Sequence, residues 1–347
     1  MTLPASGDIS IGDLATEFGV SLPKSLGNFY RGGGIVPVIV QTVGIPASGD
    51  VELGDFYGTG RETSLTTWTQ GTPSANRTWN AAAFGGGVFT ALQYVGGSTM
   101  YSTDGSSWTG STSTSGYYSA ACYGGTRFVA IADTGTAVLY SDNGTSWSSG
   151  TGSSGGDWRD VTYGNGTYVA VRNGRAGSGD NYMTSTNGSS WTQRNALSQE
   201  MTTVAFGAGL FVAMSSAGTL STYATSPDGI TWTSRSLPVS GNWKRVRYGL
   251  GMFVAVPLSG DTGLYSADGL TWTTFTLPAS GAWTALSAGP YGFFAAIYGS
   301  TQAASSADGI TWTSRTMTLA GNWLVSMQGQ GLCVVLADGF YTNKSIE

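Results

Sequence analysis

The chain contains no histidine among its 347 residues. Histidine is the commonest general base and the commonest metal ligand of proteins, so its absence removes the usual starting point for catalysis or metal binding. Charged residues make up only 10% of the chain, and the net charge is −5. Without lysine clusters, this charge gives little support for binding to nucleic acid. We therefore expect no metal, no cofactor and no nucleic-acid partner.

Cysteine, proline and long apolar runs are also scarce. Cys122 and Cys333 are the only two cysteines, and we expect both to be free, buried thiols. No apolar run reaches membrane length and the N-terminus lacks a basic-then-apolar signal pattern, so we expect neither membrane insertion nor Sec export. Glycine is abundant instead, at 54 residues, and aromatics reach 12%. This composition predicts an ordered, turn-rich protein with a neutral surface, as is common on extracellular or virion all-β proteins.

One seven-residue turn occurs six times, and at residues 226–232 it reads SPDGITW. Its acid or amide position is held by Asp104, Asn143, Asn187, Asp228, Asp268 and Asp308. An Asp-Gly or Asn-Gly pair is typical of a type I′ hairpin turn, in which both central residues have φ > 0. The serine and the acid can bond local backbone N–H groups, and the tryptophan can anchor the following strand. We interpret all six as structural turns.

Trp68 and the six tryptophans that close these turns, the last of which is Trp312, lie about 40 residues apart. A period near 40 residues with four short strands per repeat predicts a β-propeller. Repeat units begin at Trp79, Tyr118, Trp158, Met201, Trp243, Trp283 and Trp323. The last unit lacks a fourth strand, and residues 65–69 supply a strand that belongs to no other unit. The sequence therefore predicts an all-β, seven-bladed propeller closed by a clasp between its N- and C-terminal strands, which would remove two sheet edges.

Residues 1–60 differ from the repeats and contain their own duplication, PASGDI at 4–9 and PASGDV at 46–51. Such a short piece can bury little core alone. We predict two parts, an anchoring segment at 1–60 and the propeller at 61–347.

Two resemblances to known families follow from these motifs. Residues 3–10 (LPASGDIS), 17–19 (EFG) and 53–58 (LGDFYG) resemble the N-terminal segment shared by many tailed-phage virion proteins. This resemblance implies a location in the virion, with residues 1–60 docked onto other virion or tail proteins. The repeats resemble Asp-box propellers of the sialidase (BNR-repeat) type, although their turns are one residue shorter between acid and glycine. That resemblance implies turns between the third and fourth strands, on the face opposite the usual ligand site.

A catalytic centre is harder to place on this sequence. A sialidase needs an arginine cluster, a tyrosine nucleophile with a supporting glutamate, and an acid, and these residues cannot be assigned here. Asp160 and Asp180 are the one pair of carboxylates that we expect could approach each other. We therefore expect a protein without enzymatic activity.

A binding surface has three candidate parts. The aromatic residues that open the units could ring the mouth of a central channel and stack on sugars, or they could pack between blades: Trp79, Tyr118, Trp158, Trp243, Trp283 and Trp323. The irregular loop at 172–182 is either a binding loop or a solvated insertion, and offers Arg172, Arg175, Asp180 and Tyr182. A basic patch could contact an anionic glycan or mark a solvated strand end: Lys244, Arg245 and Arg247.

The interpretation that these features favour is a phage tail-fibre or tail-tip protein. Its propeller would bind a host-surface receptor, a glycan or a protein, without catalysis, and many copies per particle would raise avidity. The alternatives are a decoration or spacer protein without a ligand, and a glycan-degrading enzyme. The sequence leaves a homo-oligomer open.

Overall fold

The computed structural model describes residues 68–71, 74–75, 77–111, 115–152, 156–173, 182–195, 200–216, 220–290, 292–339 and 342–346. All of them belong to one compact unit, Leu65–Ile346. The predicted anchoring segment at 1–60 lies outside the described residues. Within these ranges, no helix has the length and apolar character needed to cross a membrane.

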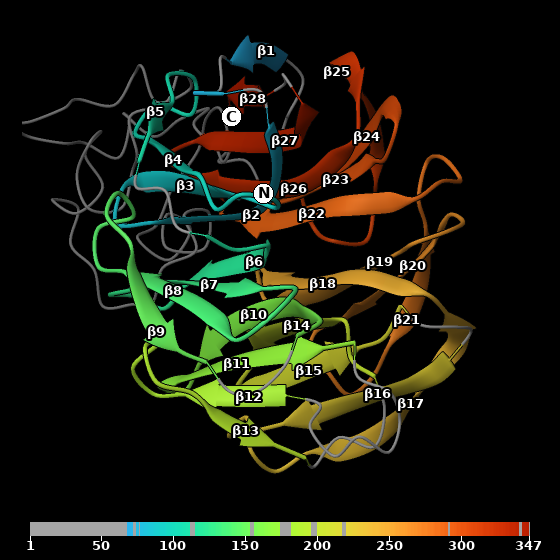
Figure 1. Ribbon diagram of the computed structural model, residues 1–347. Helices are drawn as coiled ribbons and strands as arrows, with labels where there is room; N and C mark the ends of the chain where they lie inside the picture. The colour runs from blue at the N-terminus through green and yellow to red at the C-terminus, as the bar shows by residue number, and fades with distance from the viewer. Residues whose placement is uncertain are drawn as a thin grey trace, which may run out of the picture. The chain divides into compact units, whose positions relative to one another are not determined.

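The described residues form antiparallel strands and no helix, which confirms the all-β propeller prediction (Figure 1). Five sheets have four strands each, taken in chain order from the inner to the outer strand. Their bounds are β6 Tyr118–Tyr123, β7 Phe128–Ala132, β8 Ala137–Ser141 and β9 Ser148–Thr151; β10 Trp158–Gly164, β11 Thr167–Arg172, β12 Tyr182–Ser185 and β13 Thr192–Arg194; β14 Thr203–Gly207, β15 Leu210–Met214, β16 Leu220–Ser226 and β17 Thr233–Gly241; β18 Trp243–Gly249, β19 Met252–Pro257, β20 Thr262–Ser266 and β21 Thr273–Thr276; β22 Trp283–Gly289, β23 Gly292–Ile297, β24 Ser300–Ser306 and β25 Thr313–Gly321.

The sixth sheet has eight strands. They are β1 Trp68–Gly71, β2 Arg77–Gly85, β3 Val88–Gln93, β4 Thr99–Ser102, β5 Thr109–Gly110, β26 Trp323–Gly329, β27 Leu332–Gly339 and β28 Thr342–Ile346. Residues 77 and 78 of β2 pair with residues 339 and 338 of β27, and this short ladder joins two predicted blades. The predicted count of seven blades is therefore wrong for the described part of the chain, which has six hydrogen-bonded sheets.

The two ends of the propeller are tied together by strand pairing. β1 pairs antiparallel with β28, from Trp68 opposite Ser345 to Gly71 opposite Thr342, and β28 pairs with β27. The two strands lie side by side near the top of Figure 1. The Trp68 ring packs 4.8 Å from that of Phe294, so the clasp is also anchored in the core. The predicted clasp is confirmed, and it pairs the last strand of the chain on both edges.

The hydrophobic core lies between neighbouring repeat units. In one cluster, Val129 and Ile131 of β7 meet Trp158, which opens the next unit. In another, Trp79 and Phe89 meet Val334 of β27, so the first and last units share a core. These residues are at most 1% exposed. Because each unit completes the core of its neighbour, the ring rather than the single sheet is the stable structure.

The repeated turns differ from the predicted type I′ geometry. Only the glycine has positive φ, for example Gly229 at 73°, and the preceding acid or amide does not. Asp228 Oδ1 instead accepts the backbone N–H groups of Ile230 and Thr231 at 2.8 and 2.7 Å, and Ser226 Oγ accepts the Gly229 N–H at 2.8 Å. The carboxylate therefore closes the turn from its side chain.

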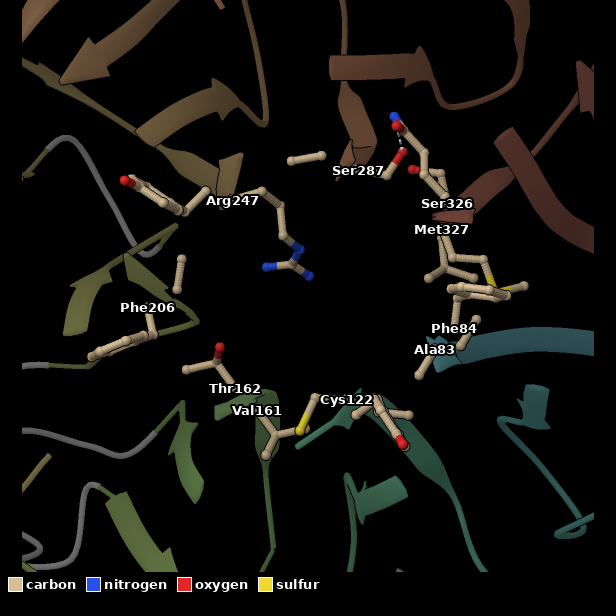
Figure 2. Close-up of a pocket in the computed structure, with 18 of the residues that line it drawn as sticks. Ala83, Phe84, Cys122, Val161, Thr162, Phe206, Arg247, Ser287, Ser326 and Met327 are labelled. Carbon is tan, nitrogen blue, oxygen red and sulfur yellow. Dashed lines mark hydrogen bonds between the residues drawn. The ribbon is translucent and has the colours of Figure 1, made fainter. Parts of the chain in front are cut away.

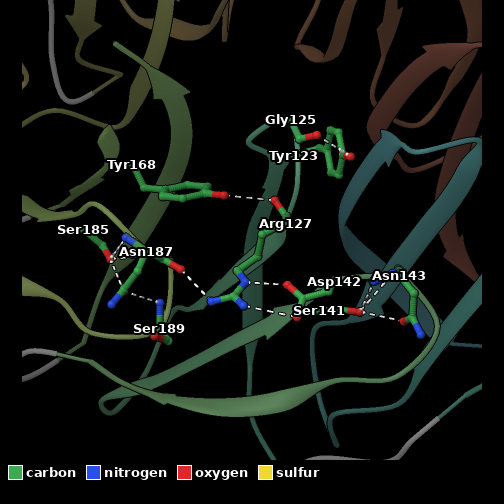
Figure 3. A network of polar contacts seen from close by, with 12 residues as sticks. Tyr123, Gly125, Arg127, Ser141, Asp142, Asn143, Tyr168, Ser185, Asn187 and Ser189 are labelled. Atoms are coloured by element: carbon green, nitrogen blue, oxygen red, sulfur yellow. Dashed lines mark hydrogen bonds and ion pairs between the residues drawn. The ribbon is translucent and has the colours of Figure 1, made fainter. Parts of the chain in front are cut away.

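The turns also contact the neighbouring unit. A Cβ at Gly229 would lie 2.6 Å from Val169 Cγ2 on β11, so a side chain there would collide with the preceding unit. On the same face, Arg127 forms an ion pair with Asp142 at 2.6 Å and donates to the backbone carbonyl of Asn187 in the next turn at 2.8 Å (Figure 3). The Tyr168 hydroxyl donates to the Arg127 carbonyl at 3.1 Å. In these contacts a side chain of one unit packs against or bonds the backbone of a neighbouring unit, which restricts the residues that the turn can accept.

Candidate binding site on the ring axis

The first strand of most units carries a β-bulge directly after its opening aromatic residue. The register shifts lie between Trp79 and Ala81, Tyr118 and Ala120, Trp158 and Asp160, Trp243 and Arg245, Trp283 and Ala285, and Trp323 and Val325. A bulge leaves one residue unpaired and re-aims its side chain, and bulges are frequent beside functional sites. The unpaired residues here are Asn80, Ser119, Arg159, Lys244, Thr284 and Leu324.

Four of these bulge residues line a polar cavity at the start of the first strands. The cavity has a volume of about 240 Å³ and is lined by Asn80, Ser119, Arg159, Asn173, Thr202, Ser216, Lys244 and Arg245. We call it the cationic cavity, because three of the described side chains that line it are positive and none of them is a carboxylate. In a chain whose net charge is −5, this is a local reversal of sign.

The three cations of the cavity differ in how they are held. Arg159 forms ion pairs with Asp133 at 3.3 Å and with Asp157 at 2.8 Å. The Tyr94 hydroxyl donates to Asp133 at 2.5 Å, and this hydrogen bond raises the pKa of Tyr94. Arg159 is thereby fixed at the edge of the cavity. Within the described residues, the side chains of Lys244 and Arg245 form no hydrogen bond or salt bridge.

The surroundings of Lys244 weaken its hold on a proton. Partial burial, followed by repulsion from Arg245 and Arg159, lowers the pKa of Lys244 to about 8, and Asp160 opposes this shift only weakly. An anion that entered the cavity would favour the charged form of this side chain.

A second polar group lies deeper along the same strands. Asp160, which is 1% exposed, accepts hydrogen bonds from the Thr203 hydroxyl at 2.8 Å and from Arg247, whose Nη1 lies 2.8 Å from Oδ2. Although burial alone would raise it, the charges of Arg247 and Arg245 hold the pKa of Asp160 below its usual value. Asp160 is therefore an ionised carboxylate that belongs to an inter-strand network, and the Thr203 hydroxyl extends this network by accepting the Val246 N–H at 3.0 Å.

Beyond this network, a second cavity of about 300 Å³ is lined by residues of β2, β6, β10, β14, β18, β22 and β26, and so lies on the ring axis. Its aromatic residues are Phe84, Tyr123, Phe206 and Tyr248. Figure 2 shows the Arg247 side chain extending toward the middle of this ring of residues. Cys122 also lines the cavity and is only half-buried, so the expectation of a buried thiol holds for Cys333 but not for Cys122. Neither cysteine forms a disulfide, as predicted, and the Cys333 sulfur lies 3.9 Å from Ser287 Oγ.

The predicted ring of ligand-binding aromatics is wrong in this structure. Trp79, Tyr118, Trp158, Trp243, Trp283 and Trp323 are at most 2% exposed. Each packs in a hydrophobic cluster, and the Trp323 indole N–H donates to the Ser300 carbonyl at 2.8 Å. The packing alternative is therefore the correct one, because no ring face is open to a sugar.

The predicted binding loop is described only at its ends. Tyr182 is 1% exposed and its hydroxyl donates to the Ile230 carbonyl in the next turn at 2.8 Å, so it is a packing residue rather than a ligand contact. The guanidinium of Arg172 lies 5.7 Å from the centre of the Trp158 ring. Arg175 and Asp180 lie outside the described residues, and with them any approach of Asp180 to Asp160.

The cationic cavity was only partly visible in the sequence. The sequence shows the basic patch that includes Lys244 and Arg245, but nothing local marks Asn80, Asn173 and Ser216 as their neighbours. A usable signal is the residue that follows the opening aromatic, because four of the six residues at this bulge position line the cavity.

Comparisons with known proteins agree on the fold. Protein families and curated protein sequences give no match. Among solved structures, a streptogramin B lyase aligns over 82% of this chain and all of its own, with a TM-score of 0.71 and 9% identity. YCF48 bound to a D1 peptide aligns over 81% and 95% with a TM-score of 0.61 and 16% identity, and the β-propeller domain of Myceliophteria thermophila Swd1 over 81% and 100% with 0.59 and 10%. At such identities the likeness establishes the β-propeller fold alone.

Proposed function

We propose that this chain is a virion protein of a tailed phage, in the tail fibre or tail tip, whose propeller binds a receptor on the host surface without catalysis. The observation that carries the proposal is the cationic cavity, where polar side chains from five neighbouring first-strand starts line one space, four of those starts being at β-bulges. The motifs at 3–10 and 53–58 support the virion location, and residues 1–60 would contact other tail or virion proteins.

The composition of the cavity supports binding over hydrolysis. Its lining side chains are amides, hydroxyls and cations, which suit hydrogen bonding to a glycan or a peptide. A glycosidase would need a pair of carboxyl groups about 5–10 Å apart and facing one space, and no such pair is found among the described residues that line this cavity. The nearby carboxylates of Asp133, Asp157 and Asp160 are each engaged by an arginine.

The test uses the full-length chain, labelled and added to cells of the phage's host and to extracts of their surface polymers. Binding at micromolar concentration that Arg245→Met weakens would support a receptor-binding role at the cationic cavity. Absence of binding to cells and to extracts would favour a decoration or spacer protein. Release of reducing ends from the host polysaccharide would instead show a glycan-degrading enzyme.

A further inference from the structure

Two positive side chains of the cationic cavity, Lys244 and Arg245, form no salt bridge with a carboxylate of the described residues. Arg245 is 8% exposed, and its guanidinium stays protonated in proteins, so its buried charge cannot be relieved by loss of a proton. Lys244 lies beside it in the same cavity. Buried charges are normally paired, because taking an unpaired charge out of water is costly.

The carboxylates of this region are already occupied. Asp160 attracts Arg245 electrostatically, but its oxygens are bonded to Arg247 and Thr203. Asp133 and Asp157 are both bound to Arg159. Arg159 and Arg247, by contrast, each form a salt bridge with at least one carboxylate of this region. Among the described residues, the charges of Lys244 and Arg245 are therefore left without a salt-bridge partner.

We propose that the cationic cavity binds one oxyanion group of a host-surface polymer, a carboxylate or a phosphate, between Lys244 and Arg245. The inference rests on the proposed function and specifies its ligand. The planar guanidinium of Arg245 matches the paired oxygens of either group, and the ammonium of Lys244 adds a mobile point charge. Asn80, Asn173 and Ser216 can bond the hydroxyls of the attached sugar or polyol.

The position of these residues in the repeat supports a ligand role over a structural one. Ser119 and Thr284 are bulge residues of other units, and their hydroxyls donate to the carbonyls of Trp158 and Trp323 in the next unit at 2.5 Å. Lys244 occupies the same bulge position and makes no such bond. The fold therefore does not need a lysine there, and an anion gives it a role.

The experiment titrates the full-length chain with D-glucuronate, glycerol 3-phosphate and the neutral sugar glucose, using calorimetry at low salt. We expect at least one oxyanion to bind at least tenfold more tightly than glucose. Preference for glucuronate would indicate an acidic polysaccharide, and preference for glycerol 3-phosphate a phosphate-linked polymer. If neither oxyanion binds more tightly than glucose, the inference is overturned.

Matched variants locate the site. Lys244→Met and Arg245→Met should each weaken oxyanion binding at least tenfold. Arg315→Met removes an arginine whose Nε donates to Ser305 Oγ at 2.9 Å on another unit, and should leave binding unchanged. Equal losses in Arg315→Met and Arg245→Met would mean a general charge effect and overturn the inference. If Arg245→Met does not fold, Lys244→Met decides, and unchanged affinity in that variant also overturns it.

The two proposals fail in different ways. Binding of the chain to host cells without binding of either oxyanion would end the anion site and keep the receptor role. Oxyanion binding that depends on Lys244 and Arg245, in a chain that ignores host cells and their extracts, would support the site and end the receptor role.

Discussion

The six turns and the starts of the first strands follow the same repeat, but they keep it to different degrees. In every turn the serine Oγ accepts the glycine N–H at 2.8–2.9 Å. At the starts of the first strands, the second residue after the one that opens the unit is Ala81, Ala120, Ala285 or Val325 in four units. In three consecutive units it is Asp160, Thr203 or Arg245.

This difference separates the residues that hold the propeller together from those that are available to bind a ligand. Turn residues contact a neighbouring unit through fixed backbone geometry, so a change in one of them disturbs the packing. The first-strand starts of β10, β14 and β18 carry ionised or hydroxyl groups where small apolar residues suffice elsewhere. Departures from a repeat that cluster in adjacent units mark the place where a function has been added to the scaffold.

The largest expected effect lies on the structural side of this comparison. Trp283 is fully buried and packs against Val254 and Val256 of the preceding unit. Trp283→Ala should lower the free energy of unfolding by about 3–5 kcal/mol, measured by denaturant unfolding. Leu270→Ala, at a side chain that is 43% exposed, should change it by less than about 0.5 kcal/mol. Normal stability in Trp283→Ala together with lost glycan binding would restore the aromatic ring as a ligand site.

A smaller effect distinguishes the turn glycines from other glycines with positive φ. Gly229→Ala should cost about 2–4 kcal/mol, because the new Cβ is strained at φ 73° and also collides with Val169. Gly209 has φ 77° but open space around it, so Gly209→Ala should cost only about 1–2 kcal/mol. Thermal unfolding of both variants measures the difference. Equal losses would show that the turn is required for its backbone conformation and not for contact with the preceding unit.

The sequence predicted the features that depend on repetition. The period near 40 residues predicted the propeller, and the unpaired strand around Trp68 predicted the clasp with the C-terminal strand. The blade count failed because two residues of β2 pair with β27, and no local pattern announces such a ladder. The predicted circle of ligand-binding aromatic residues is wrong because successive side chains point to opposite sides of a strand. The interpretation placed the ligand on Trp158 and Trp243, whereas Arg159 and Lys244 line the cavity.

Acid should reveal which turns depend on a carboxylate. Burial would raise the pKa of Asp228, but hydrogen bonds from the backbone N–H groups of Thr231 and Ile230 lower it to about 2. Its contribution to stability is therefore complete above pH about 4 and is lost as the pH falls towards 2.

Asp228→Asn keeps the acceptor oxygen, as Asn143 shows by accepting the Thr145 N–H at 2.9 Å. It should lower stability at pH 7 by about 1 kcal/mol or less and make unfolding less sensitive to acid. Urea titrations at pH 7 and pH 3 measure both effects, with Asp261→Asn as a control outside the repeated turns. The same acid sensitivity in Asp228→Asn and the unmodified chain would locate the acid-labile contacts elsewhere.

The smallest effect has the opposite sign and is the sharpest way to separate the two regions. With its pKa lowered to about 8, Lys244 binds its proton less tightly in the folded chain than in the unfolded chain. Its positive charge therefore costs stability at pH 7, and this cost shrinks as the pH rises from 8 towards 10, where Arg245 and Arg159 remain charged.

Lys244→Met should leave Tm unchanged or raise it by a few degrees at pH 7, with a smaller difference at pH 10. Arg315→Met should lower Tm, because Ser305 loses its partner. A binding residue can lower the stability of the fold when its ligand is absent, and this is the behaviour we expect of Lys244. A fall in Tm for Lys244→Met would place this residue with the structural repeat instead.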